Sequence, residues 1–203
     1  LSEKLRGLYN KSSLFIGLSV GTTDNPFAPT AGHRHSFNVK YSGLGAGEYH
    51  YVKWMIDLRN YQKLGGFVAA TRLSLGRIAS FDAFGVVPVE DLFFSGGANS
   101  VRGWGRHELG PRDAAGKPTG GNSFVEASVE GRVPVWGSLQ SALFCDAGNV
   151  WSDSPRYVVG EIRVALGAGL RFQTPIGPIR FDLARPVFEK GGYRWHLTVG
   201  EAF

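Results

Sequence analysis

The chain has a single cysteine and no long apolar run. Because Cys145 is alone among 203 residues, no internal disulfide and no cysteine-based metal cluster can form. No stretch approaches the roughly 18 apolar residues of a transmembrane helix, and Leu1 to Asn10 lacks the apolar core of a signal peptide. Helix-length periodic segments are missing as well. Strands remain as the way for this chain to build a core or to cross a membrane.

Signs of enzyme chemistry and of nucleic-acid binding are also sparse. The net charge is +5, but the basic residues are spread along the chain, so we expect no nucleic-acid partner. Gly43, Gly45 and Gly47 miss the dinucleotide and phosphate-loop spacings, and a hairpin turn explains them better. His33 and His35 have no further cluster of ligands to complete a metal site. We therefore expect no enzyme activity, no metal and no cofactor.

What the chain does have is repeated alternation of apolar and polar residues. Segments of about ten residues alternate in this way, and glycine, proline, asparagine and aspartate separate them, as in transmembrane β-barrels. One face of these segments carries Glu, Arg, Asp and Lys together with many of the 29 glycines, as expected of a wet, crowded lumen. A soluble sandwich is the alternative, since it also alternates. We predict an all-β, transmembrane antiparallel β-barrel unit of about nine strands over residues 1–203.

The alternation stops between residues 79 and 121, where we predict one long loop. Structureless loops of this length are uncommon and usually functional. Within it, residues 93–104 set Arg102 among glycines that permit backbone angles closed to other residues. The segment is either a shaped loop tip that presents Arg102 or a surface turn with an incidental arginine.

Three separated motifs together resemble the BamA and TamA family of outer-membrane assembly and translocation barrels. They are residues 96–104 (GGANSVRGW), 144–151 (FCDAGNVW) and 177–184 (GPIRFDLA). The resemblance implies that residues 1–203 form the C-terminal part of such a barrel, with no POTRA domains, in a Gram-negative outer membrane or an organelle of bacterial descent. Since family barrels have about sixteen strands, we expect the missing N-terminal strands, a second chain or a homodimer partner to complete the wall.

The resemblance also implies an inward-folding loop at 79–121 whose arginine contacts acidic residues of the barrel wall. The matching residues are Arg102, Gly103, Glu130 and Asp146. The alternation of side chains along each strand independently puts Glu130 and Asp146 on the polar face. There a guanidinium can make bidentate hydrogen bonds with a carboxylate. Ordinary solvation in the lumen is the alternative for both carboxylates. The remaining family-type positions are Gly96, Gly97, Val101, Trp104, Gly177, Pro178, Arg180 and Asp182.

The end of the chain resembles the terminal strand of outer-membrane barrels, which commonly finish on an aromatic residue. Trp195, Leu197, Val199 and Phe203 fit that pattern. Glu201 departs from it, because we expect position 201 to lie on the outward face, where an apolar residue is usual.

The resemblance implies a non-enzymatic insertase or translocase. Its partners would be outer-membrane lipid and client β-barrel or secreted polypeptides, with a weak seam that templates incoming strands by augmentation. The alternative is a secretion pore or the anchoring barrel of a fused passenger such as a patatin-like lipase. A plain diffusion porin is disfavoured, because an inward-folding loop bound to the barrel wall would obstruct the lumen.

Overall fold

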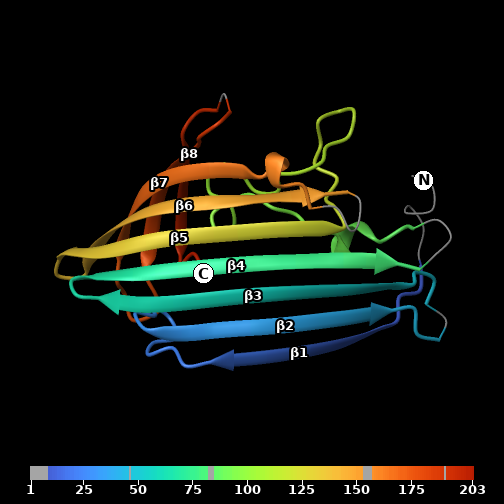
Figure 1. The fold of residues 1–203 in the computed structure, drawn as a ribbon, viewed down its shortest axis with the longest axis horizontal. Helices are drawn as coiled ribbons and strands as arrows, with labels where there is room; N and C mark the ends of the chain where they lie inside the picture. Colours follow the sequence, from blue (N-terminus) through green and yellow to red (C-terminus); the bar gives the residue numbers. More distant parts are fainter. Residues whose placement is uncertain (1–8, 46, 82–84, 153–156, 190) are drawn as a thin grey trace.

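A computed structural model describes residues 9–45, 47–81, 85–152, 157–189 and 191–203. Within these residues the chain forms one antiparallel sheet of nine strands, each paired with the next along the sequence (Figure 1). The strands are β1 (Ser13–Gly21), β2 (Gly32–Ser42), β3 (Tyr51–Leu64), β4 (Phe67–Ser80), β5 (Ser123–Trp136), β6 (Leu139–Trp151), β7 (Arg163–Phe172), β8 (Ile179–Pro186) and β9 (Arg194–Val199). Two short 3-10 helices, η1 (Val89–Asp91) and η2 (Val159–Glu161), lie in the connections. The described residues contain no helix that is long and apolar enough to cross a membrane.

The sheet is curved, and its two faces differ in the way that the alternation predicts. Along β8, Arg180, Asp182 and Ala184 are buried on the concave face, while the neighbours between them are exposed. Leu143 on β6 is 71% exposed on the convex face, although its neighbour Phe144 is 4% exposed. A soluble sandwich would bury its apolar faces instead. The apolar convex face and the charged concave face confirm the predicted barrel-type wall.

The two ends of the sheet carry connections of different length. The hairpins β3–β4 and β5–β6 turn through residues 65–66 and 137–138 at the left of Figure 1. The opposite end carries the connection from β4 to β5, which runs from Phe81 to Asn122. Outer-membrane barrels have short periplasmic turns and long extracellular loops. We therefore refer to the short-turn end as the periplasmic end.

Part of the long connection lies along the concave face (Figure 1, green), whereas residues 112–117 are exposed. Near its start, Phe93 packs on Phe124 of β5 with ring centroids 4.5 Å apart. Both rings belong to a buried cluster with Tyr51 of β3, Ile78 of β4 and Val150 of β6. The predicted limits of the loop, 79 and 121, are close to the observed ends of β4 and β5. The base of the loop is thus part of the core and links four strands.

Among the described residues, β1 and β9 each pair with one neighbour only, so the sheet is not closed. After Val199 the chain leaves the sheet at Gly200, whose φ of +95° is one that side-chain-bearing residues rarely adopt. The Phe203 ring then stacks on Tyr61 of β3 at 6.5 Å, and the Tyr61 hydroxyl donates to the Phe203 carbonyl at 2.8 Å. The chain end therefore lies on the concave face.

This path corrects two expectations for the chain end. Glu201 is not on the outward face, because its side chain is 6% exposed and its Oε1 lies 3.2 Å from Arg132 Nη1 on the concave face. Phe203 does not continue the outward row either, since it is 6% exposed against Tyr61. The turn at Gly200 breaks the alternation on which both expectations depend. The other three residues of the terminal pattern, Trp195, Leu197 and Val199, are exposed on the convex face.

Candidate functional site

Arg102, near the middle of the long loop, is bound to the sheet by its whole guanidinium group. Its Nε and Nη2 donate to the two carboxylate oxygens of Asp146 at 2.7 and 2.8 Å, and its backbone N–H donates to the same carboxylate at 3.1 Å. Its Nη1 donates to Glu130 at 2.6 Å. The residue is only 1% exposed. The structure thus brings together Arg102, Glu130 and Asp146, three residues that lie far apart in the sequence.

An aromatic ring covers one face of the same guanidinium. The Arg102 carbon Cζ lies 3.3 Å from the centre of the Phe144 ring on β6. The ring fits there because Gly167 of β7 has no side chain. A Cβ at position 167 would lie 2.2 Å from the Phe144 ring. A cation over a ring is stabilised most when both are withdrawn from water. Sequence reasoning placed Phe144 in the second motif without a role and did not single out Gly167, because the alternation gives the face of a residue and not its contacts across strands.

Three further arginines extend the ion pairs around Arg102. Arg171 on β7 donates to Glu130 at 3.0 Å and to Asp182 at 2.5 Å. Arg180 lies 3.0 Å from Asp182, and Arg132 donates to Glu130 at 2.9 Å. Arg171 and Arg132 were missed as site residues, although both lie on the polar face that the alternation predicts. Because opposite charges surround one another, the low-dielectric interior can hold them, and removing one partner is costly.

The loop on either side of Arg102 is shaped by glycines and held by the wall. Gly96 and Gly97 have φ of +98° and +113°, and a Cβ on Gly103 would lie 2.6 Å from Ala165 Cβ on β7. These positions therefore need glycine for different reasons, two for conformation and one for close approach. Arg180 Nη2 donates to Ala98 O at 2.6 Å.

Other predicted motif residues support the loop from outside the ion-pair network. Val101 is 1% exposed and packs with Leu109, Ala165 and the partly buried Trp104. Gly177 and Pro178 do not reach Arg102, because they form the turn before β8. There Gly177 has φ +111°, and the Pro178 carbonyl accepts from Gly200 N–H at 2.8 Å.

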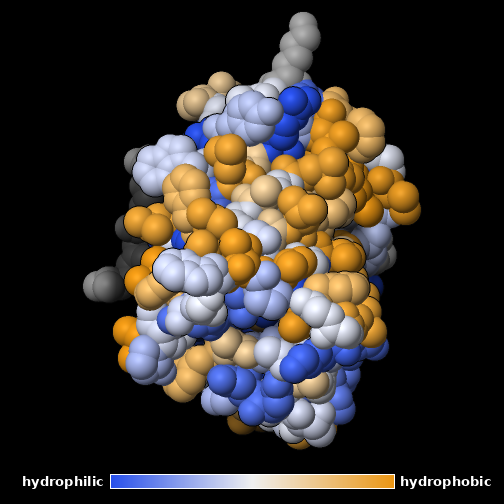
Figure 2. Space-filling model, turned by 90° about the vertical axis from the view of Figure 1, so that its left-hand side faces the viewer, coloured by the Kyte–Doolittle hydropathy of each residue, from blue (hydrophilic) through white to orange (hydrophobic). Residues whose placement is uncertain are grey.

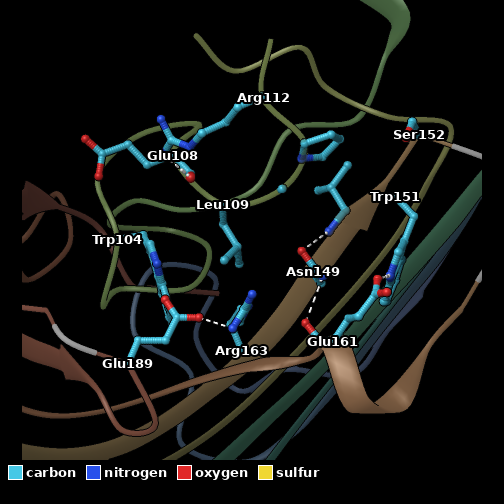
Figure 3. A pocket seen from close by; sticks show the side chains of 13 residues that line it. Trp104, Glu108, Leu109, Arg112, Asn149, Trp151, Ser152, Glu161, Arg163 and Glu189 are labelled. Atoms are coloured by element: carbon cyan, nitrogen blue, oxygen red, sulfur yellow. Dashed lines mark hydrogen bonds and ion pairs between the residues drawn. The ribbon is translucent and has the colours of Figure 1, made fainter. Parts of the chain in front are cut away.

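The rest of the second motif shapes a cavity of about 460 Å³ at the long-loop end (Figure 3). Asn149 Nδ2 donates to the backbone carbonyl of Glu161 at 2.8 Å, and Trp151 Nε1 donates to the Glu161 carboxylate at 2.7 Å. Trp104 and Arg112 line the cavity from the loop. The contacts of Asn149 and Trp151 fix η2 against the end of β6, so the motif has an evident structural role.

The chain also contains one match to a catalytic pattern that sequence reasoning missed. Residues 17–21 (GLSVG) fit the Gly-x-Ser-x-Gly pattern of a nucleophile elbow. They lie within β1, where Ser19 pairs with Ser36 of β2, so the sharp strand-to-helix turn of an elbow is not formed. His33 and His35 stack at 4.7 Å on β2, and the described residues hold no group of three or more side chains suited to a metal.

An antiparallel sheet with an apolar convex face, a charged concave face and a long loop bound inside defines the wall of an outer-membrane-type β-barrel. The Omp85 superfamily domain matches residues 2–203, and the chain belongs to that superfamily. The expected resemblance to BamA-type barrels is thereby confirmed.

Relatives of known name agree with this assignment. The chain is 32% identical over 198 residues to the outer membrane protein assembly factor BamA of Neorickettsia risticii. The alignment covers 89% of this chain and 25% of that protein. It is 26% identical to BamA of Neisseria meningitidis over 86% of this chain and 26% of that protein. It is also 24% identical to the sorting and assembly machinery component 50 homolog of Mus musculus, over 91% of this chain and 43% of that protein. The chain therefore spans about a quarter of the length of its BamA relatives.

Solved structures show the same fold. BamA from Haemophilus ducreyi superposes with a TM-score of 0.74 at 25% identity, over 91% of this chain and 40% of that one. CdiB from Acinetobacter baumannii shares the fold alone, with a TM-score of 0.59 at 17% identity over 91% and 32% of the two chains. Together with the apolar convex face, the likeness to BamA relatives and to the BamA structure places the protein in the outer membrane, as expected. The relative from mouse fits the expected alternative of an organelle of bacterial descent.

Proposed function

We propose that this chain forms the C-terminal part of a barrel that assembles or translocates other polypeptides at the outer membrane. The observation that carries the proposal is the burial of Arg102 between Asp146 and Glu130, which fixes a long loop to the inner wall. The likeness to proteins named as outer-membrane assembly factors supports it. The proposed partners are outer-membrane lipid and client β-barrel or secreted polypeptides.

The geometry suits work that makes and breaks no covalent bond. Arg102 connects β5 through Glu130, β6 through Asp146 and β8 through Asp182, which lies 3.5 Å from Nη1. Ion pairs to three strands stiffen the wall, because sliding of one strand would separate a buried charge from its partner. Among the described residues β9 pairs only with β8, and a strand edge of this kind can add an incoming strand by backbone hydrogen bonding. A stiff wall beside a free edge would hold a template for a client strand.

A secretion pore, including an anchoring barrel for a fused passenger, is the alternative. Conductance separates the two activities, because an open secretion pore passes ions whereas a barrel obstructed by its own loop does not. We expect planar bilayers holding the full-length protein to show no stable open channel. Steady channels of large conductance would favour the alternative and also a diffusion porin.

The test uses the full-length protein in liposomes with an unfolded β-barrel client. Arg102→Ala leaves three carboxylates with less compensation, and we expect the rate of client assembly to fall at least about tenfold while strand content is unchanged. Arg106→Ala is the matched control, because Arg106 is in the same loop and exposed. Equal rates for the parent and Arg102→Ala would overturn the proposal.

A further inference from the structure

The edge strand β9 has little of the sheet to hold it. It is 6 residues long, and among the described residues it pairs only with β8. Its convex-face side chains, Trp195, Leu197 and Val199, are exposed. Figure 2, a view of the periplasmic end, shows hydrophobic and hydrophilic surface close together, as expected of strands with one face of each kind. A strand with so few buried apolar contacts opens easily unless something else holds it.

The long loop supplies contacts along the concave face of β9. The three side chains on that face lie opposite the buried residues of β8 and all connect to the loop; they are Arg194, His196 and Thr198. Arg194 Nη2 donates to Glu108 at 3.0 Å. Thr198 Oγ1 accepts from Arg180 Nε at 3.1 Å, and Arg180 Nη2 donates in turn to Asn99 Oδ1 at 2.7 Å. The loop therefore follows the whole length of the strand.

The middle contact joins β9 to the best-held residue of the loop. His196 Nε2 lies 2.7 Å from the backbone carbonyl oxygen of Arg102. A carbonyl can only accept, so Nε2 carries the proton and donates. The Arg194–Glu108 pair is weaker, because its side chains are 53% and 36% exposed and exposed ion pairs contribute little. His196 is thus the main direct link between the edge strand and the loop.

These contacts make the positions of the loop and of β9 depend on each other. If β9 moves away from the wall, His196 leaves the Arg102 carbonyl. If the loop moves away from β6, the same bond is lost from the other side. An interaction free energy between two elements is reciprocal, so loosening either element loosens the other.

We propose that the long loop holds the edge strand β9 in position and that His196 is the positioning residue of this coupling. The coupling itself depends only on the contacts between the loop and the strand. Its consequence, that an incoming client strand meets an edge of fixed position, rests on the proposed function.

The first experiment measures hydrogen exchange of the β9 amides in the full-length protein in lipid nanodiscs. His196→Ala removes one hydrogen bond, and we expect these amides to exchange about fivefold faster while those of β5 and β6 are unchanged. General destabilisation would instead speed exchange in all strands. Equal exchange of β9 in His196→Ala and the parent would overturn the proposal.

Two further variants at this strand separate the hydrogen bond from other effects. His196→Gln keeps an N–H donor at a similar reach, so we expect exchange between that of the parent and that of His196→Ala. Leu197→Val is the matched control, because Leu197 lies on the convex face of the same strand and is exposed. Exchange in His196→Gln as fast as in His196→Ala, or in Leu197→Val as fast as in His196→Ala, would contradict the role of the bond.

The second experiment disturbs the loop from its other side. Phe144→Leu removes the ring that stacks on Arg102, and β7 and β8 lie between Phe144 and β9. We expect about threefold faster exchange of the β9 amides, because the loosened loop no longer presents the Arg102 carbonyl steadily. Leu143→Ala, on the convex face of β6, is the control and should leave β9 as in the parent. Unchanged exchange of β9 in Phe144→Leu would overturn the coupling, and this test decides if His196→Ala fails to fold.

The two proposals fail in different ways. If the parent assembles a client in liposomes but exchange of β9 does not follow the loop, the coupling is wrong and the proposed function stands. If exchange of β9 follows the loop but the parent assembles no client, the coupling stands and the proposed function is wrong.

Discussion

The guanidinium carbon of Arg102 lies 3.3 Å from the centre of the Phe144 ring, so an aromatic face covers the cation whose edge is bound by carboxylates. This relationship joins the loop to β6 in two ways at once. A planar guanidinium can make both contacts, because its hydrogen-bond donors lie in the plane and its face remains free to stack.

Phe144→Leu tests the contribution of the ring. We expect a loss of about 2 kcal/mol in the stability of the loop anchor, because the cation–π contact is withdrawn from water. Proteolysis of the loop under native conditions measures this. Leu143→Ala, on the convex face of the same strand, is the control and should leave the loop as resistant as in the parent.

Arg102→Lys tests the shape of the cation. Lysine keeps the charge but cannot bind both oxygens of Asp146 and stack on Phe144 together, so we expect only partial retention of loop resistance, between the parent and Arg102→Ala. Resistance equal to that of the parent would show that charge alone holds the loop.

Gly103→Ala tests the close approach of the loop to β7. A Cβ at position 103 would lie 2.6 Å from Ala165 Cβ, so the loop must shift, at a cost of about 1–3 kcal/mol. Thermal unfolding in detergent gives the difference in stability. Gly131→Ala is the control, because a Cβ there meets nothing within 4 Å. Similar unfolding temperatures for both variants would contradict the close packing.

Asp91 at the base of the loop gives a prediction about pH. Burial opposes its ionisation, but hydrogen bonds from Lys11, Lys40 and Tyr51 outweigh burial and lower the pKa of Asp91 to about 2 from 3.8. The folded pKa lies below the unfolded one, so its contribution of about 2 kcal/mol is present above pH 3.8 and is lost as the pH falls through about 2. Loop resistance to pepsin should therefore fall across this window in the parent. Asp91→Asn should be less resistant at pH 5 and change less with pH.

The open edges give a prediction about assembly. Strand edges at membrane depth must find partners, and β1 and β9 each have one free edge among the described residues. We expect native mass spectrometry of residues 1–203 in detergent to show a dimer or a larger species. A stable closed monomer would contradict the strand count.

The sequence by itself determined the wall. Alternation with a period of two places Glu130, Asp146 and Asp182 on one face of their strands because successive side chains of a strand point to opposite sides. The glycines around Arg102 likewise marked a shaped loop before any contact was known, since positive φ is a local property of the chain. The fold class and the face of these carboxylates therefore followed from local rules, whereas the contact of Arg102 with Glu130 and Asp146 was expected from the family resemblance.

Only the tertiary structure decided which residues on that face meet. Gly167 makes room for Phe144, its pairing partner on the neighbouring strand, and Arg171 of β7 reaches across β6 to Glu130 of β5. The path after Val199 was likewise a tertiary matter. Gly200 turns the chain inward, and Arg132 and Tyr61, far away in sequence, receive Glu201 and Phe203 on the concave face. The alternation along a strand predicts which face a residue lies on, whereas the partners of that residue depend on the curvature of the whole sheet.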